Sequence, residues 1–460
     1  MPLPIALLYL LAAVLFILGL KQLSSPRGAR RGNWTAAIGM VIALGATIPL
    51  LHFTAAGLAI TAVGVLIGAV VGTSAARTVR MTAMPQMVAM FNGVGGGAAA
   101  LVAIVELFRE PAHPSFTLTL PSVFSIVIGS ISFAGSLVAF AKLQELLTGR
   151  PITYPAQWLV NGAIVGGVLA LAVVVLQVIS TPAAYLPLLG LALVLGVAFV
   201  LPIGGADMPV VISMLNAFTG LAVAASGFVL GNFALIVAGT LVGASGTLLT
   251  KLMSDAMGRS LGNVLFGAFG APVAGTGAAG IEGRSVRAGS AEDIGTLLAY
   301  SRRVIIVPGY GLAVAQAQHA ARELATELEK RGIEVTYAIH PVAGRMPGHM
   351  NVLLAEANVP YDQLKEMDEV NGEFQSADVA LVVGANDVVN PAARNTPGSP
   401  IYGMPILNVD EAHNIVFLKR SMRPGFAGID NELLYDPKTT MLFGDAKDSL
   451  TKLVAAVKAA

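Results

Sequence analysis

Cysteine is absent from this chain of 460 residues, and charged residues make up only 12% of it. The missing thiols exclude disulfides, thiolate metal sites and cysteine nucleophiles. The net charge of +1 argues against a nucleic-acid-binding role. The first apolar run has no basic leader of the kind that precedes a cleaved signal, and basic residues follow it, so we expect an uncleaved membrane anchor.

Hydrophobic residues are in excess, at 55% of the chain with a mean hydropathy of +0.74. This is too apolar for an ordinary soluble protein. The charges are unevenly placed, with 16 in residues 1–260 and 39 in residues 261–460. We therefore expect a membrane domain at 1–260 and a soluble domain at 296–460. Residues 261–295 between them contain a long stretch rich in Gly, Ala and Ser without periodicity, which is typical of a flexible linker.

Nine apolar runs are long enough, or nearly so, to span about 30 Å of hydrocarbon. The third and the seventh have the least distinct boundaries. The runs are Leu3–Leu20, Trp34–Leu51, Ala55–Val71, Met84–Leu107, Val123–Leu143, Gln157–Val178, Leu186–Val200, Met208–Leu230 and Phe233–Leu252.

Basic residues predict the orientation of these spans. If nine spans cross the membrane in alternating directions, ten cations lie on one side and only Arg109 on the other. Because basic residues accumulate on the cytoplasmic side, the side with ten cations is predicted to be cytoplasmic. The ten are Lys21, Arg27, Arg30, Arg31, Arg77, Arg80, Lys142, Arg150, Lys251 and Arg259. The N-terminus is then outside and the soluble domain cytoplasmic.

One segment of the membrane domain is repeated. Residues Met84–Gly96 align without gaps on Met208–Gly220, with Met, Pro, Met, Asn and Gly in common. Each copy begins with a proline at a helix start, where its missing N–H costs little. Each is followed by a Gly/Ser-rich span that ends in a lysine. The pattern resembles the parallel repeats of transport folds.

The repeat places Asn92 and Asn216 at matched depth, roughly 10 Å into the membrane at 1.5 Å per residue. They are either interhelical hydrogen-bond partners or parts of a hydrated polar path, to which we also assign Ser245. Asp207 at the start of the second copy is either a helix cap or a proton entry point. No titratable residue of this chain is expected in mid-membrane, so if protons cross here, water or a second subunit must supply the protonated group.

Strand and helix patterns alternate from Ser301 onward, which predicts a doubly wound parallel sheet. Strands are expected at Val304–Val307, Glu334–Ile339, Val379–Val383, Ile406–Val409 and Ile415–Leu418. Helices are expected at Leu312–Arg331, Met350–Ala357, Tyr361–Val370 and Ala446–Ala459. Ligands bind such sheets at the carboxyl ends of their strands.

Gly309 and Gly311 follow the first of these strands. They would allow a tight turn and close approach of a pyrophosphate to the backbone, although an ordinary strand–turn–helix unit has the same pattern and Val314 replaces the third glycine. The second strand ends in Ala338-Ile339-His340-Pro341 without the acidic residue that NAD binding favours. A later strand ends in Lys419-Arg420-Ser421, which is either solvated surface or a site for a 2′-phosphate.

Two further loops have the composition of ligand loops. The first, His340–His349, contains two prolines, two glycines and Arg345, a cation suited to phosphate. The second, Gly384-Ala385-Asn386-Asp387, places an acid where a nicotinamide or ribose could lie. Turn formation and helix capping are the structural alternatives for the two loops.

Nearly the whole sequence resembles the beta subunit of proton-translocating nicotinamide nucleotide transhydrogenase. The most specific segments are Pro308–Gly311 with Ala315–Gln318, His340–Asn351, Gly384–Ala393, Lys419–Met422, Gly444–Ala446, Asp207–Pro209 and Asn216. The resemblance implies a polytopic α-helical bundle followed by a Rossmann-like domain that binds NADP(H) in a reversed orientation. It also implies an NAD(H)-binding alpha subunit or subunits with further membrane helices, hydride transfer coupled to proton movement, two copies of each half, and location in the inner (plasma) membrane.

The resemblance assigns roles residue by residue. Proton path and coupling fall to Asn92, Asp207, Asn216, Ser245 and Asp387. Cofactor binding falls to Gly309, Tyr310, Gly311, Ala313, Val314, Ala315, Gly344, Arg345, Met346, Pro347, Gly384, Ala385, Asn386, Asp387, Lys419, Arg420, Ser421, Gly425, Phe426, Ala427, Gly444, Asp445 and Ala446. No metal site is expected. The sequence departs from the family at two positions. Some relatives have a histidine at the position of Asn92, and a histidine of the alpha subunit is the expected titratable group in its place. Phe426 stands where relatives often have a tyrosine.

A nucleotide-sensing membrane transporter or channel without turnover is the other function that this sequence allows.

Overall fold

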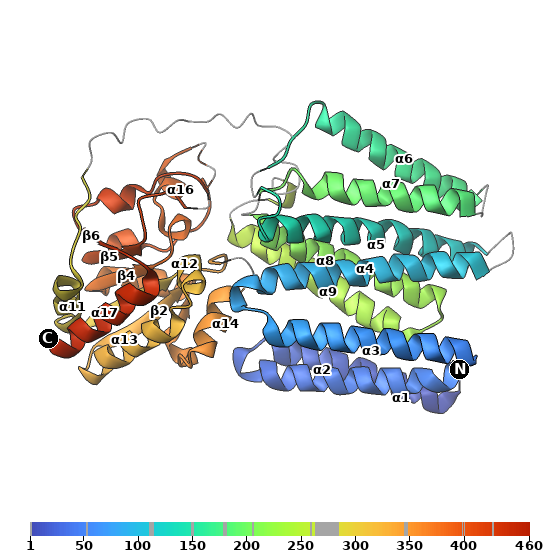
Figure 1. The fold of residues 1–460 in the computed structure, drawn as a ribbon, viewed down its shortest axis with the longest axis horizontal. Coiled ribbons are helices and arrows are strands. Elements are labelled where there is room, and N and C mark those ends of the chain that lie inside the picture. The colour runs from blue at the N-terminus through green and yellow to red at the C-terminus, as the bar shows by residue number, and fades with distance from the viewer. Residues whose placement is uncertain are drawn as a thin grey trace. The chain divides into compact units, whose positions relative to one another are not determined.

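The computed structural model describes the chain apart from residues 1, 52–53, 110–114, 149–150, 178–181, 205–206, 258–259, 263–284, 345–347, 398, 400 and 426. The chain divides into two compact units, Met1–Thr250 and Lys251–Ala460 (Figure 1). Each unit is described by itself.

The first unit is built from long apolar helices that run side by side (Figure 1). Each predicted span corresponds to one helix. In the described part of the chain, eight helices are long and apolar enough to cross a membrane, and α7 has a shorter apolar stretch, Ala184–Val200. The helices are α1 (Leu3–Leu23), α2 (Pro26–Thr47), α3 (Ala55–Thr78), α4 (Met84–Arg109), α5 (Phe116–Leu143), α6 (Gln157–Gln177), α7 (Pro182–Val200), α8 (Met208–Val229) and α9 (Phe233–Ala256).

Glycines form the contact seams of the two repeat copies. A Cβ added at Gly129 of α5 would lie 2.5 Å from the carbonyl oxygen of Gly96 on α4. A Cβ added at Gly220 of α8 would lie 2.5 Å from the backbone nitrogen of Gly243 on α9. Small residues at these positions let the helix backbones approach closely where no hydrophobic force from water acts. The α4–α5 and α8–α9 pairs thus each have a backbone contact that only glycine permits.

Hydroxyl groups join α5 to α8 across the centre of the first unit. Ser125 and Ser226 lie 2.8 Å apart between their hydroxyl oxygens, and Ser132 and Thr219 lie 2.6 Å apart. Ser132 also donates to the Leu215 carbonyl of α8 at 2.8 Å. These bonds satisfy buried polar groups where no water can.

The second unit contains a six-stranded, all-parallel sheet with the order β3-β2-β1-β4-β5-β6. The strands are β1 (Arg303–Pro308), β2 (Glu334–Ile339), β3 (Leu364–Glu366), β4 (Val379–Val383), β5 (Asn414–Lys419) and β6 (Thr439–Phe443). Its helices are α11 (Ala291–Ala299), α12 (Tyr310–Val314), α13 (Gln318–Lys330), α14 (His349–Glu356), α15 (Met367–Val370), α16 (Ala392–Asn395) and α17 (Ala446–Ala459). The order reverses between β1 and β4, which is where such sheets bind ligands.

Four local predictions were wrong. The helix expected at Leu312–Arg331 is two helices, α12 and α13, because Gln316 adopts a positive φ of 49° between them. The range Tyr361–Val370 contains the edge strand β3, and only α15 is helical there. Ile406, Leu407 and Val409 are buried, but the range Ile406–Val409 forms no strand, and β6 was not predicted. Short strands have too few residues for their periodicity to identify them.

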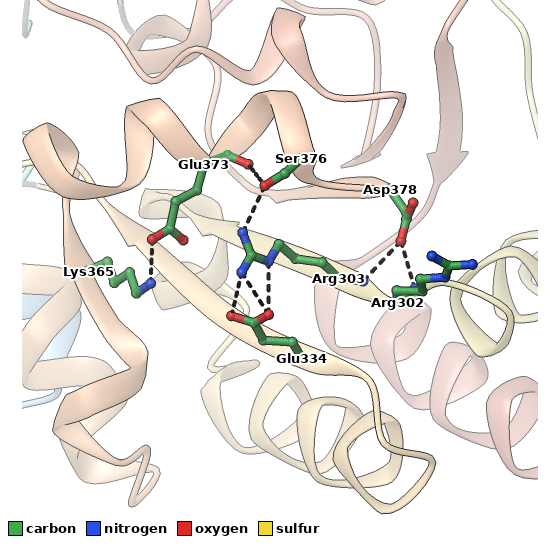
Figure 2. Close-up of polar contacts among 7 residues, drawn as sticks. All are labelled: Arg302, Arg303, Glu334, Lys365, Glu373, Ser376 and Asp378. Atoms are coloured by element: carbon green, nitrogen blue, oxygen red, sulfur yellow. Dashed lines mark hydrogen bonds and ion pairs between the residues drawn. The ribbon is translucent and has the colours of Figure 1, made fainter.

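The amino ends of β1, β2 and β4 are tied together by polar contacts (Figure 2). Arg303 makes a paired contact with Glu334 at 2.8–3.0 Å. One carboxylate oxygen of Asp378 accepts from the backbone N–H groups of Arg302 and Arg303 at 2.7 and 3.0 Å. Partial burial raises the pKa of Asp378, but these two N–H donors together with the charges of His413 and Arg302 outweigh it, and the net shift is downward. The contacts hold the strands in register at the edge opposite the candidate site.

Helix α11 belongs to the second unit although it begins within the range expected to be linker. Ser290 caps it by accepting from the Asp293 N–H at 3.1 Å. Ala288 pairs with Met441 of β6, and Gly295 of α11 lies against Ala456 of α17.

Candidate functional site

The site is built where the loops after β1 and β4 cross. The Gly309 N–H donates to the Val383 carbonyl and the Gly311 N–H donates to the Gly384 carbonyl, both at 2.9 Å. A Cβ added at Gly309 would lie 2.5 Å from the nitrogen of Ala385, and one at Gly311 would lie 2.6 Å from the Gly384 Cα. Glycine is therefore required at both positions because the two loops pack against each other. The sequence pattern of the turn did not indicate this requirement.

Lys419, at the end of β5, is directed to the loop after β4. Its ammonium donates to Asn386 Oδ1 at 2.9 Å, and Asn386 Nδ2 donates to Asp387 Oδ1 at 3.0 Å. Desolvation lowers the pKa of Lys419, while the carboxylates of Asp387 and Asp430 oppose that shift. A half-buried cation, an amide and a carboxylate therefore form one connected polar group at the carboxyl edge.

The loop after β5 folds onto this polar group. Asp387 Oδ2 accepts from the Ala427 N–H at 2.9 Å, and Asn431 Nδ2 donates to the Asn386 carbonyl at 3.1 Å. A Cβ added at Gly425 would lie 2.6 Å from Asn386 Nδ2. Residues 425–431, apart from residue 426, are thus attached to the β4 loop by side-chain hydrogen bonds.

Arg420 and Ser421 follow Lys419 and have exposed side chains. Ser421 Oγ accepts from the Arg423 N–H at a long 3.5 Å. Within the described residues, the Arg420 guanidinium has no hydrogen bond or ion pair to the rest of the chain. An exposed guanidinium beside a hydroxyl suits a phosphate group.

The turn after β6 lies beside this cluster. The Gly444 N–H donates to the Lys419 carbonyl at 3.2 Å, and Gly444 has a φ of 158°. Asp445 caps α17 by accepting from the Lys447 N–H at 2.9 Å, and Ala446 is buried. The two sequence segments, Lys419–Ser421 and Gly444–Ala446, therefore meet in space.

His340, at the tip of β2, is buried with 1% exposure. Its Nδ1 accepts from the Val342 N–H at 3.2 Å, so Nε2 carries the proton and donates to the Pro405 carbonyl at 2.8 Å. Burial lowers the pKa of His340 to about 4, although the bond to Pro405 opposes the shift. The residue anchors the start of its loop as a neutral imidazole.

The rest of this loop is partly described. Gly344 has a φ of 108°, and a Cβ there would lie 2.5 Å from the ring nitrogen of His349. The rings of His349 and Tyr310 are 6.1 Å apart between centroids. The predicted ligands Arg345, Met346 and Pro347, together with Phe426, lie outside the described residues.

Three predicted residues lie on and after α12 near the crossing. Ala313 is buried, Val314 is 42% exposed, and Ala315 is half-buried at the end of the helix. Ala385 is buried against Gly309. The exposed Val314, which stands at the position of the third glycine of the fingerprint, is not in the packed crossing.

The two repeat asparagines of the first unit have different surroundings. Asn92 is 9% exposed, and its Nδ2 donates to Ser136 at 2.9 Å and to Ser132 at 3.3 Å. Asn92 Oδ1 is buried without a hydrogen-bond partner among the described residues. Asn216 is half-buried. Asn92 therefore donates hydrogen bonds from α4 to α5, and its carbonyl oxygen Oδ1 is available to accept one.

The other membrane candidates are at the ends or on the outside of helices. Asp207 occupies the N-cap position of α8 but accepts no capping hydrogen bond from it. Ser245 is exposed, and its hydroxyl donates to the Val242 carbonyl of its own helix at 3.3 Å. The fold does not bring either residue into the Asn92–Ser136 contact.

Sequence reasoning missed two asparagines that complete the site. Asn390 is fully buried and donates to the Asp430 carbonyl at 2.9 Å, and Asn431 is 1% exposed. Both hold the loop after β5 onto the loop after β4. The close spacing of Asn386, Asp387 and Asn390 could have indicated that this loop is held by its side chains. Short amide and carboxylate side chains commonly form hydrogen bonds with nearby backbone.

Fold and site together define a class of protein: a membrane-embedded helical bundle joined to a doubly wound domain with a polar cluster at its switch point. Comparisons with known proteins agree. The family model described as NAD(P) transhydrogenase beta subunit matches residues 5–456. Two relatives named NAD(P) transhydrogenase subunit beta, from Rhodospirillum rubrum and from a named strain of that species, are each 51% identical over 457 residues, covering 98% of this chain and 98% of the relative. The chain belongs to the NAD(P) transhydrogenase beta subunit family, a family of oxidoreductases.

Proposed function

We propose that this chain is the NADP(H)-binding, proton-conducting subunit of a membrane transhydrogenase. A hydride passes directly from the nicotinamide of one cofactor to that of the other, so NADH and NADP⁺ give NAD⁺ and NADPH, or the reverse. NAD(H) is bound by a partner alpha subunit or subunits that add membrane helices. The complex contains two copies of each half.

The observation that carries this proposal is the joined polar group at the β4–β5 edge. Lys419, Asn386 and Asp387 are connected by hydrogen bonds beside the exposed Arg420 and Ser421. We assign the 2′-phosphate to Arg420 and Ser421, and to Lys419 the added role of positioning the β4 loop. The Gly309–Gly311 turn and the loop containing Arg345 are assigned to the pyrophosphate.

Asp387 is assigned to coupling between the cofactor site and the loop after β5. Its carboxylate accepts from Ala427, so a change at the nicotinamide end would be transmitted to that loop. The bound nicotinamide supplies the hydride chemistry. The protein aligns the two cofactors and excludes water.

The first unit is assigned to proton movement in the inner (plasma) membrane. The distribution of basic residues supports an outside N-terminus and a cytoplasmic second unit. We assign residues 1–260 and 296–460 to the membrane and cofactor-binding functions and 261–295 to the connection between them, although α11 begins at Ala291 within that connection. Asn92, Asn216, Asp207 and Ser245 are the residues assigned to the path.

Hydride transfer in the assembled complex tests this function. The chain is purified with its alpha subunit, reconstituted in vesicles, and supplied with NADPH and an NAD analogue. Reduction of the analogue with proton movement supports the proposal. Cofactor binding without transfer in an assembled complex would favour the nucleotide-sensing transporter or channel instead.

A further inference from the structure

Lys142 is the one charged Lys, Arg, Asp or Glu side chain among the described residues that is fully buried, at 3% exposure. The sequence placed it on the cytoplasmic side, at the end of the predicted span Val123–Leu143. The structure confirms that position, one residue before the end of α5, but buries its side chain inside the first unit. Lys251, which ends the span that follows the second repeat copy, is exposed. The two repeat lysines are therefore not equivalent.

The ammonium of Lys142 is held by backbone carbonyls. Its Nζ donates to the Leu201 carbonyl at 2.5 Å and to the Ile203 carbonyl at 2.7 Å. Both residues lie just after the end of α7, where the helix dipole places partial negative charge. Within the described residues Lys142 forms no ion pair with a carboxylate. A lysine of α5 thus stabilises the end of a different helix.

Several chain segments meet at this lysine. The Leu201 carbonyl also accepts from the Ile152 N–H at 3.1 Å. Gln86, in the first turn of α4, donates to the carbonyl of Leu143, the residue after Lys142, at 3.1 Å. Gln86 Oε1 is buried without a partner in the described part of the chain. The lysine therefore lies at a buried polar crossing of α4, α5, the segment before α6 and the end of α7.

The crossing is adjacent in sequence to the start of α8. The Asp207 N–H donates to the Gly204 carbonyl at 3.1 Å, and Met208 is fully buried. Fixing Leu201 and Ile203 to α5 therefore limits the positions that Asp207 and the first turn of α8 can adopt. Asn92 and Ser136, on α4 and α5, contact each other one to two turns from the same crossing.

A buried charge is costly in a membrane protein and marks a functional position by default. An apolar side chain of similar volume would fill the space without that cost. We propose that Lys142 is a positioning residue for proton-coupled turnover: its cation holds the α7–α8 junction, and with it Asp207, against the helix pair that contains Asn92. This inference rests on the proposed function.

The test uses the assembled complex in vesicles. Lys142→Met removes the charge and the donors at nearly the same volume, Lys142→Arg keeps both, and Lys251→Met is the matched control at the exposed repeat position. Proton-coupled hydride transfer is measured as kcat and as KM for NADP(H). Hydrogen exchange is measured at residues 200–204.

We expect Lys142→Met to lower kcat at least tenfold with KM changed less than twofold, and to increase exchange at 200–204. Lys142→Arg should return kcat to within threefold of the parent, and Lys251→Met should stay within twofold. A kcat of Lys142→Met within twofold of the parent would overturn the inference. Three other results would also overturn it: a loss of kcat in Lys142→Met that Lys142→Arg does not recover, a change in KM for NADP(H) as large as the change in kcat, or unchanged hydrogen exchange at residues 200–204.

The two proposals fail in different ways. A parent complex without hydride transfer refutes the proposed function and this inference with it. A fully active parent with an equally active Lys142→Met refutes only the inference. If Lys142→Met does not assemble, Lys142→Gln, which keeps two N–H donors without the charge, is measured against the same limits.

Discussion

Lys419 and Asn386 are joined by a 2.9 Å hydrogen bond across the carboxyl ends of β5 and β4. The bond aligns the side chain of Asn386 so that its amide nitrogen reaches Asp387. The lysine is therefore already engaged with the protein at the edge where a phosphate is expected. Its neighbours Arg420 and Ser421 are exposed.

Arg420→Ala should separate cofactor discrimination from loop positioning. We expect it to weaken NADP(H) binding about 10- to 100-fold, because a charge-assisted contact contributes about 1.5–3 kcal/mol. NAD(H) binding should change less than threefold. Lys419→Ala should weaken both cofactors, since it releases Asn386. Calorimetric titration of the chain measures both, and equal losses for the two cofactors in Arg420→Ala would contradict the 2′-phosphate assignment.

Asp387→Asn should loosen the loop after β5. The Ala427 N–H would exchange a charged acceptor for a neutral one, a change of about 1 kcal/mol, so amide exchange at residues 427–431 should accelerate about fivefold. Asp436→Asn is the matched control, because Asp436 accepts from an exposed Lys438 N–H elsewhere. Unchanged exchange in Asp387→Asn would show that the carboxylate does not hold the loop.

Gly384→Ala should be strongly destabilising. Gly384 has a φ of 68°, and an added Cβ would lie 2.5 Å from the Leu312 nitrogen. We expect a loss of more than about 2 kcal/mol, measured by urea unfolding with pulse proteolysis. Gly428→Ala isolates the backbone cost, because its φ is 72° with open space around it, and should cost about 1 kcal/mol. Gly372→Ala, with open space and no positive φ, should be nearly neutral.

His340 should make the second unit less stable in mild acid. Its pKa is lowered to about 4 when folded, from 6.5 when unfolded, so between these values the unfolded state binds more protons. Stability therefore falls as pH drops from 6.5 towards 4, by about 2 kcal/mol between pH 7 and pH 5. Urea unfolding at the two pH values measures this. His340→Gln should remove that part of the pH dependence, and the exposed His319→Gln should leave it intact.

Asn216→Leu should impair proton-coupled turnover while leaving NADP(H) affinity unchanged. The half-buried amide is lost from a helix whose other faces pack on α5 and α9. Thr240→Ala is the control, since the Thr240 hydroxyl is exposed and donates to its own helix. If proton movement in Asn216→Leu is unchanged, Asn216 has only a structural role and does not belong to the proton path.

The order of elements and the class of fold were readable from the sequence. Nine apolar runs correspond to nine helices in the described chain, because hydrocarbon thickness sets a minimum length that composition alone reveals. The strands β1, β2, β4 and β5 were found because their residues are apolar and buried on both faces. β3 was missed because it has only three residues, and β6 because it lies at the edge of the sheet and begins with two threonines, so its apolar signal is weak.

The sequence by itself determined the two-part organisation, the family resemblance and the segments of the candidate site. Only the tertiary structure decided what individual side chains do. Gly309 and Gly384 are required by a crossing of two loops, Lys419 binds Asn386, and Lys142, expected only as a cytoplasmic-side cation at the end of a span, has a buried side chain. These outcomes depend on contacts between residues far apart in the chain, which local periodicity and composition do not encode.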